Sequence, residues 1–258
     1  MPDREAARIG TPLPAGAWTG RVAIVSPHLD DAVLSLGASM RAVSRRGVHV
    51  DVLTVLSGDP ESATPSDEHN AKAGFATAGD ASCARRLEDE RACQALGAQA
   101  MWLPFADDAN EAPPDDDAIA GELARRLKGY DAVLLPGFPL LHRDHQRVSR
   151  LVLRTLEPDS VIGLYVEQPY ASWHSLSRAS IKREPAPAGG TLADVGLRLT
   201  SEGRWQRTRC APSDWAAKVR ATGAYRSQIA VLRKAPRTRI LAYEVLRGGE
   251  RVLWCGLR

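Results

Sequence analysis

Apolar runs alternate with amphipathic stretches through the first 170 residues of the chain. The apolar runs predict strands at about residues 21–26, 48–56, 99–103, 130–136 and 161–166. Between them, apolar residues recur at helical spacing and predict helices at about residues 33–47, 81–97, 114–127 and 148–156. Alternation of strands and helices is typical of a doubly wound, mostly parallel sheet with right-handed crossovers. The sequence therefore predicts an α/β fold.

The pattern changes in the last third of the chain. Residues 171–210 are polar and rich in turns, and short alternating segments such as 204–207 predict small antiparallel strands that form a cap. A helix is expected at about residues 213–232. A final strand or two is expected between residues 240 and 255.

No low-complexity linker divides the chain, so we expect a single domain. Residues 1–20 are rich in Pro, Gly and Ala and predict an irregular lead-in to a domain at 21–258. Residues 57–80 lose all periodicity and predict a long loop at the carboxyl end of a strand. Loops of that length are usually functional or mobile, so this one is expected to border a site.

Composition narrows the class of protein. The formal charge of +3 reflects 34 basic and 31 acidic residues with no basic block, so no nucleic-acid partner is expected. The four cysteines form no C-x-x-C pair, which argues against a zinc knuckle and a dense disulfide framework. No apolar run predicts a leader or a membrane span. A soluble, cytoplasmic protein is the expectation.

Two polar clusters follow two of the predicted strands. His28, Asp30 and Asp31 come after the strand at 21–26, and His142, Asp144 and His145 come after the strand at 130–136. Parallel strands end at one edge of a sheet, so the clusters are expected to meet. The first turn lacks the glycines of a phosphate loop, which disfavours a nucleotide-binding enzyme.

These residue types suit a catalytic metal. His28, Asp31 and His145 would make a two-histidine, one-carboxylate site with open positions, as expected of catalytic zinc. Asp30 would then be a general base, and His142 an acid or an oxyanion donor. Taken alone, each cluster is more often a helix cap or a solvated helix start. Their coincidence at two strand ends favours the metal site.

The two clusters also resemble the motifs of a known family. The LmbE-like, or PIG-L, N-acetylglucosaminyl-phosphatidylinositol de-N-acetylases carry H-P-D-D-E after a strand and a later H-P-D-H, and this chain has H-L-D-D-A at 28–32 and H-R-D-H at 142–145. The run H-L-D-D-A-V-L-S is similar to a bacterial branch. Arg85-x-x-Glu88, Y-x-E-x-P-Y at 165–170 and Y-R-S-Q at 225–228 look like further blocks of the family.

The resemblance implies a Rossmann-like fold and a zinc-dependent hydrolase that removes acetyl from an N-acetylated amino sugar. His28, Asp31 and His145 match the zinc ligands, although these ligands would also accept iron(II). Asp30 matches the general base.

The remaining matches concern the acid and the substrate. His142 matches the catalytic histidine, and Asp144 matches the carboxylate that tunes it, which is expected to raise the pKa of His142. Arg85 and Asp107 match positions that contact sugar hydroxyls in relatives.

Two departures qualify the resemblance. Some relatives carry an oxyanion-binding tyrosine where this chain has Leu140, and the glutamate that ends the first motif is Ala32. An amidase acting on a non-acetyl amide and a non-catalytic glycan-binding protein remain alternatives. The sequence names neither the sugar conjugate nor the oligomeric state.

Overall fold

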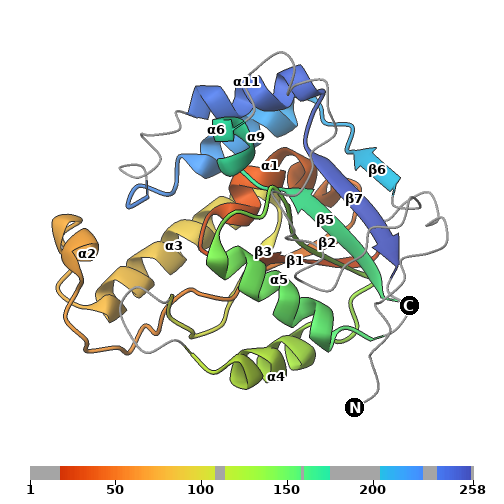
Figure 1. Ribbon diagram of the computed structural model, residues 1–258. Coiled ribbons are helices and arrows are strands. Elements are labelled where there is room, and N and C mark those ends of the chain that lie inside the picture. The colour runs from red at the N-terminus through yellow and green to blue at the C-terminus, as the bar shows by residue number, and fades with distance from the viewer. Residues whose placement is uncertain (1–17, 108–113, 158–159, 175–203, 229–236, 257–258) are drawn as a thin grey trace.

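A seven-stranded sheet lies at the centre of the computed structural model (Figure 1). The structure describes residues 18–107, 114–157, 160–174, 204–228 and 237–256. The strands are β1 (Arg21–Ser26), β2 (His49–Thr54), β3 (Gln99–Trp102), β4 (Ala132–Phe138), β5 (Val161–Val166), β6 (Arg204–Arg207) and β7 (Arg251–Gly256). Their order is β3-β2-β1-β4-β5-β7-β6, with β1 to β5 parallel and β7 antiparallel to both of its neighbours. The predicted mostly parallel sheet is confirmed.

Helices cover both faces of the sheet (Figure 1). They are α1 (Asp31–Ser44), α2 (Glu68–Lys72), α3 (Ala78–Leu96), α4 (Asp116–Arg126), α5 (Arg143–Thr155), α6 (Tyr170–His174), α9 (Pro212–Thr222) and α11 (Arg237–Arg247). Alternate residues of β1 divide between two cores: Ala23 and Val25 pack with α4 and α5, whereas Val22 and Ile24 pack with α1, α3 and α9. Burial on both faces explains why β1, β4 and β5 are apolar along most of their length.

The sheet reverses its direction of winding between β1 and β4. These strands are neighbours, paired from Val22 with Ala132 to Ile24 with Leu134. From β1 the chain proceeds to β2 and β3 on one side, and from β4 it proceeds to β5 on the other. A crevice opens at the carboxyl ends of the strands where an α/β sheet changes direction in this way. Both polar clusters follow these two strands, so their predicted meeting has a structural basis.

The C-terminal region corrects one expectation. The final strand or two expected between residues 240 and 255 is one strand, β7, and residues 237–247 form helix α11, which was not expected. The residues that α11 buries are spaced as on one side of a helix: Ile240, Tyr243, Glu244 and Arg247. Two of these four are charged, so the apolar pattern alone did not reveal the helix.

Other boundaries also differ from the expectation. Helix α3 begins at Ala78, three residues before residue 81, because Thr77 and Asp80 form a capping box. The expected loop at 57–80 therefore contains α2 and the first turn of α3. Helix α5 begins within the second polar cluster, at Arg143, and not at residue 148.

The predicted cap and lead-in lie largely outside the described residues. Residues 171–174 belong to helix α6, where small strands were expected, while the strand at 204–207 is confirmed as β6. Within the lead-in, Trp18 packs edge-on against Trp254 with ring centroids 5.8 Å apart. Among the described residues, no helix combines the length and the apolar character needed to cross a bilayer.

Candidate metal and catalytic site

A tight turn after β1 presents the first cluster. The Ser26 hydroxyl donates to the carbonyl oxygen of His28 (2.7 Å) and accepts from the Ala32 backbone N–H (3.1 Å). This closes the turn and starts α1. Asp30 has φ of 110°, a region that non-glycine residues rarely occupy. Backbone strain of this kind tends to occur at functional sites, where the surrounding structure holds it in place.

The second cluster begins helix α5. His142 is the N-cap of α5, and its Nδ1 accepts a hydrogen bond from the Asp144 backbone N–H (3.3 Å). In a neutral ring the proton must then reside on Nε2, and a charged ring carries a proton there too. His142 therefore has an Nε2–H donor in either state.

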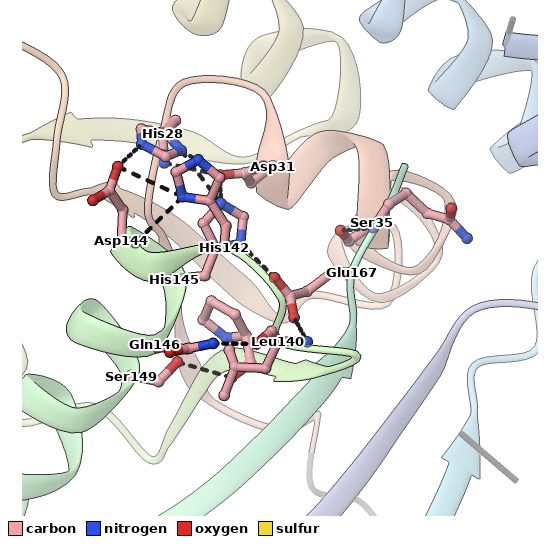
Figure 2. Close-up of polar contacts among 12 residues, drawn as sticks. His28, Asp31, Ser35, Leu140, His142, Asp144, His145, Gln146, Ser149 and Glu167 are labelled. Atoms are coloured by element: carbon pink, nitrogen blue, oxygen red, sulfur yellow. Dashed lines mark hydrogen bonds and ion pairs between the residues drawn. The ribbon is translucent and has the colours of Figure 1, made fainter. Parts of the chain in front are cut away.

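Three ligand atoms converge between the two clusters (Figure 2). His28 Nδ1 lies 3.4 Å from Asp31 Oδ2 and 3.3 Å from His145 Nε2, and His145 Nε2 lies 3.2 Å from Asp31 Oδ2. Atoms bound at about 2.0–2.1 Å to one tetrahedral ion would lie about 3.3–3.4 Å from one another. The donor set expected from the sequence therefore fits a divalent metal in both chemistry and spacing.

Two further carboxylates fix the orientation of the histidine rings. His28 Nε2 lies 3.0 Å from Asp144 Oδ2, and His145 Nδ1 hydrogen-bonds to Glu167 Oε2. A ring nitrogen that donates outward to a carboxylate leaves the lone pair of the other nitrogen free to bind a metal. Glu167 was not among the residues expected at the site, although it lies in the Y-x-E-x-P-Y block. Its burial at the end of β5 depends on the sheet, which the sequence does not show directly.

The electrostatics of the site attract positive charge. Burial alone would lower the pKa of His145, but the charge of Asp31 and bonds to carboxylates outweigh burial and raise this pKa to about 10. The pKa of His28 rises to about 9 against the effect of burial because of Asp144 and Asp31. Burial would raise the pKa of Asp31, yet the two histidines lower it below its ordinary value. A divalent cation would supply the same positive charge.

Asp30 differs from its neighbour Asp31. Burial and then the negative charge of Asp31 raise the pKa of Asp30 well above its ordinary value. A carboxylate with a raised pKa accepts a proton more readily near neutral pH. Asp30 also lines the cleft, so it can meet a substrate.

Asp144 raises the pKa of His142, as expected, but the expected net rise of this pKa is wrong. The pKa of His142 is lowered, because burial and the charges of His145 and His28 outweigh Asp144. The Asp144 carboxylate lies 3.6 Å from His142 Nδ1 and only 3.0 Å from His28 Nε2. These three residues, His28, His142 and Asp144, could also form a second metal-binding group.

Leu140 cannot replace the tyrosine of some relatives. Its side chain is fully buried, and its backbone N–H donates to Glu167 Oε1 (2.7 Å). Tyr170, in contrast, lines the cleft with its ring centroid 6.2 Å from that of His142 and 5.4 Å from that of His145. Tyr170 belongs to the Y-x-E-x-P-Y block at 165–170.

The cleft above these residues has a volume of about 1020 Å³ and includes both expected substrate contacts, Arg85 and Asp107. Arg85 Nη2 donates to Asn70 Oδ1 (2.6 Å). Residues from the 57–80 segment also line the cleft, as expected.

The R-x-x-E motif at 85–88 and the Y-R-S-Q motif at 225–228 meet at the cleft wall. Glu88 accepts from both the backbone N–H (2.9 Å) and the hydroxyl (2.7 Å) of Ser227, which places Gln228 in the wall. The Tyr225 hydroxyl donates to Asp89 (2.7 Å). The motifs R-x-x-E and Y-R-S-Q thus hold the C-terminal part of the chain against helix α3.

Fold and site together define a doubly wound α/β protein with a candidate metal centre at the switch between β1 and β4. The pattern of the GlcNAc-PI de-N-acetylase (PIG-L) family matches residues 23–156, which is about half of the chain. The chain belongs to this family.

Individual relatives carry deacetylase names. The chain is 32% identical to 2'-N-acetylparomamine deacetylase of Streptomyces fradiae over 169 residues, which is 59% of this chain and 58% of that protein. The crystal structure of the A40926 pseudoaglycone deacetylase has 25% identity and a TM-score of 0.70, and the match covers 93% of this chain and 98% of that one. A deacetylase triple mutant from the teicoplanin pathway has 23% identity and a TM-score of 0.72 over the same shares, which supports the fold.

Proposed function

We propose that the protein is a metal-dependent hydrolase that removes the N-acetyl group from an amino sugar or its conjugate. The convergence of His28 Nδ1, Asp31 Oδ2 and His145 Nε2 on one point at the cleft floor carries this proposal. Membership of the de-N-acetylase family and the names of the relatives support the reaction class.

The three converging residues would hold the metal, with zinc the ion that best suits two imidazoles, one carboxylate and open positions. A divalent metal there would polarise a carbonyl oxygen and acidify a water. Asp144 and Glu167 orient the two histidines, so we assign them as positioning residues.

Asp30 would transfer the proton, and His142 would stabilise the negative charge that forms on the carbonyl oxygen. Asp30 accepts the proton of the attacking water as the carbon–oxygen bond forms. His142 donates its Nε2–H to the carbonyl oxygen, which becomes negative as the tetrahedral intermediate forms. Asp30 then returns its proton to the amine nitrogen, the carbon–nitrogen bond breaks, and acetate and the free amine leave.

The test is acetate release from a panel of N-acetylated amino sugars, followed before and after removal of metal with a chelator. We expect acetate and free amine in equal amounts, loss of turnover on chelation and recovery when zinc or iron(II) is returned. Release of a different acyl group from a matched amide panel would favour the amidase alternative. Full turnover in metal-free protein would refute the metal-dependent mechanism.

A further inference from the structure

The cleft extends well beyond the candidate metal centre. His28, Asp31 and His142 occupy its floor, and the walls come from the segments after β2 and β3, from α2 and α3, and from Gln228. Its volume of about 1020 Å³ is at the upper end of the range of small-molecule sites. An N-acetylated monosaccharide would fill only part of it, so the remaining wall is available to the rest of a conjugate.

The charge of the cleft is opposite to that of the chain. Six aspartates and two arginines line it, although basic residues outnumber acidic ones in the whole sequence. A divalent metal would offset two of the excess carboxylates and leave the cleft negative. Charges of one sign in a cleft with low-dielectric walls focus the field and concentrate ligands of the opposite charge.

Three of these aspartates lie away from the metal centre on separate segments. Asp59 follows β2, Asp67 precedes α2, and Asp107 follows β3. We call these three residues the acidic wall. Asp59 accepts from the Glu61 N–H (2.9 Å) and Asp67 from the Asn70 N–H (2.6 Å), which fixes both carboxylates against their own backbone.

We propose that this cleft selects amino-sugar conjugates of more than one ring whose other amino groups are free and protonated, an inference that rests on the deacetylase function proposed above. The acetamide would lie over the metal centre while ammonium groups elsewhere on the substrate face the acidic wall. A phosphate-linked sugar, such as the GlcNAc-PI for which the family is named, would be repelled by the same carboxylates.

The test compares three mono-N-acetylated substrates of two rings. The first keeps its remaining amines, the second carries hydroxyls in their place, and the third carries a phosphate. At low salt we expect kcat/KM to be about ten-fold or more higher for the amine compound than for the hydroxyl compound. The phosphate compound should have the lowest kcat/KM. The preference for the amine compound should shrink as added salt screens the charges.

Asp59→Asn and Asp67→Asn remove the charge, while the Asn side-chain oxygen can still accept the backbone hydrogen bond that each carboxylate accepts. Each variant should lower kcat/KM for the amine substrate by about two- to five-fold and leave the hydroxyl substrate unchanged. Glu68→Gln is the matched control: it is adjacent to Asp67 but pairs with Lys72 on the surface and does not line the cleft.

Binding separates this proposal from the function on which it rests. Calorimetry should show tighter binding of the free polyamine than of its hydroxyl analogue, a difference that needs no turnover. Equal affinities, or equal effects of the acidic-wall variants on both substrates, would overturn the proposed selectivity while leaving deacetylation standing. If the protein bound the polyamine but released acetate from none of the substrates, the proposed deacetylase function would be refuted. The inference that the cleft binds cationic sugars would still stand.

Discussion

At the residue scale, the strongest feature is the arrangement of lone pairs. Each of the two histidines directs one ring N–H at a carboxylate, Asp144 for His28 and Glu167 for His145, and its other ring nitrogen lies near Asp31. Lone pairs at this spacing repel one another unless protons or a metal cation lie between them. The sequence singled out these three residues, because each follows an apolar strand within a polar motif.

Replacing Glu167 by Gln should weaken metal binding about 10- to 100-fold. The amide oxygen can still accept from the Leu140 N–H, but the amide NH₂ then faces His145 Nδ1 and moves the ring proton to Nε2. Competition with a chelating dye measures the change. Glu157→Gln, two residues after the end of α5, is the matched control. Equal metal affinity in the two variants would show that Glu167 does not support metal binding.

Replacing His142 by Ala should lower turnover about 10²- to 10³-fold while the metal content stays near that of the wild type. The expectation follows from the Nε2–H donor that remains after Nδ1 accepts from the Asp144 N–H. Turnover and elemental content are measured on the same preparation. A variant that retained near-normal turnover would exclude His142 from the reaction, and one that lost the metal would favour the second ligand group.

At the element scale, the sequence predicted the elements that bury apolar residues and missed those that bury charged residues. Strands β1, β2, β4 and β5 and helix α1 bury mainly apolar residues, and this apolar pattern predicted them closely. Helix α11 buries Glu244 and Arg247 beside Ile240 and Tyr243, and a charged residue cannot be assigned to the interior before its partner is known. Likewise, Glu167 lies at the site because β5 is adjacent to β4, which no local pattern reveals.

The contact between helix α3 and the segment at 225–228 gives a prediction at this scale. Glu88→Ala removes both hydrogen bonds to Ser227 and should lower the free energy of unfolding by about 1–3 kcal/mol. Because Gln228 lines the cleft, KM should rise several-fold while kcat changes little. Denaturant unfolding and steady-state kinetics measure these effects. Glu90→Ala on the same helix is the control, and equal behaviour of the two would show that this contact does not shape the cleft.

At the scale of the whole molecule, a buried charged group joins three helices. Lys218 donates to Glu244 (2.8 Å) and Glu250 (2.6 Å), and Glu250 also accepts from the backbone N–H groups of Ala38 and Ser39. Burial and the charge of Glu250 raise the pKa of Glu244 to about 8, although Lys218 opposes this. The group thus connects α1, α9 and α11, and the raised pKa of Glu244 favours the neutral form of this carboxyl group.

This group predicts how stability depends on pH. Between about pH 4.5 and 8 the folded protein holds a proton on Glu244 that the unfolded chain releases, so the contribution of Glu244 to stability falls as pH rises through this window. Glu244→Gln stays neutral at every pH. The free energy of unfolding of the wild type should therefore decline relative to this variant from pH 5 to pH 8. Parallel pH curves for the two proteins would contradict a raised pKa for Glu244.

The central claim is that Asp31 holds a metal while the adjacent Asp30 moves a proton, and one paired measurement tests it. Metal content and acetate turnover are determined for the wild type, Asp30→Asn and Asp31→Asn. We predict about one bound metal per chain in the wild type and in Asp30→Asn, with turnover of the latter lower by about two to four orders of magnitude. Asp31→Asn should lose both metal and turnover. An Asp30→Asn protein without metal beside an Asp31→Asn protein that keeps it would contradict the assignment.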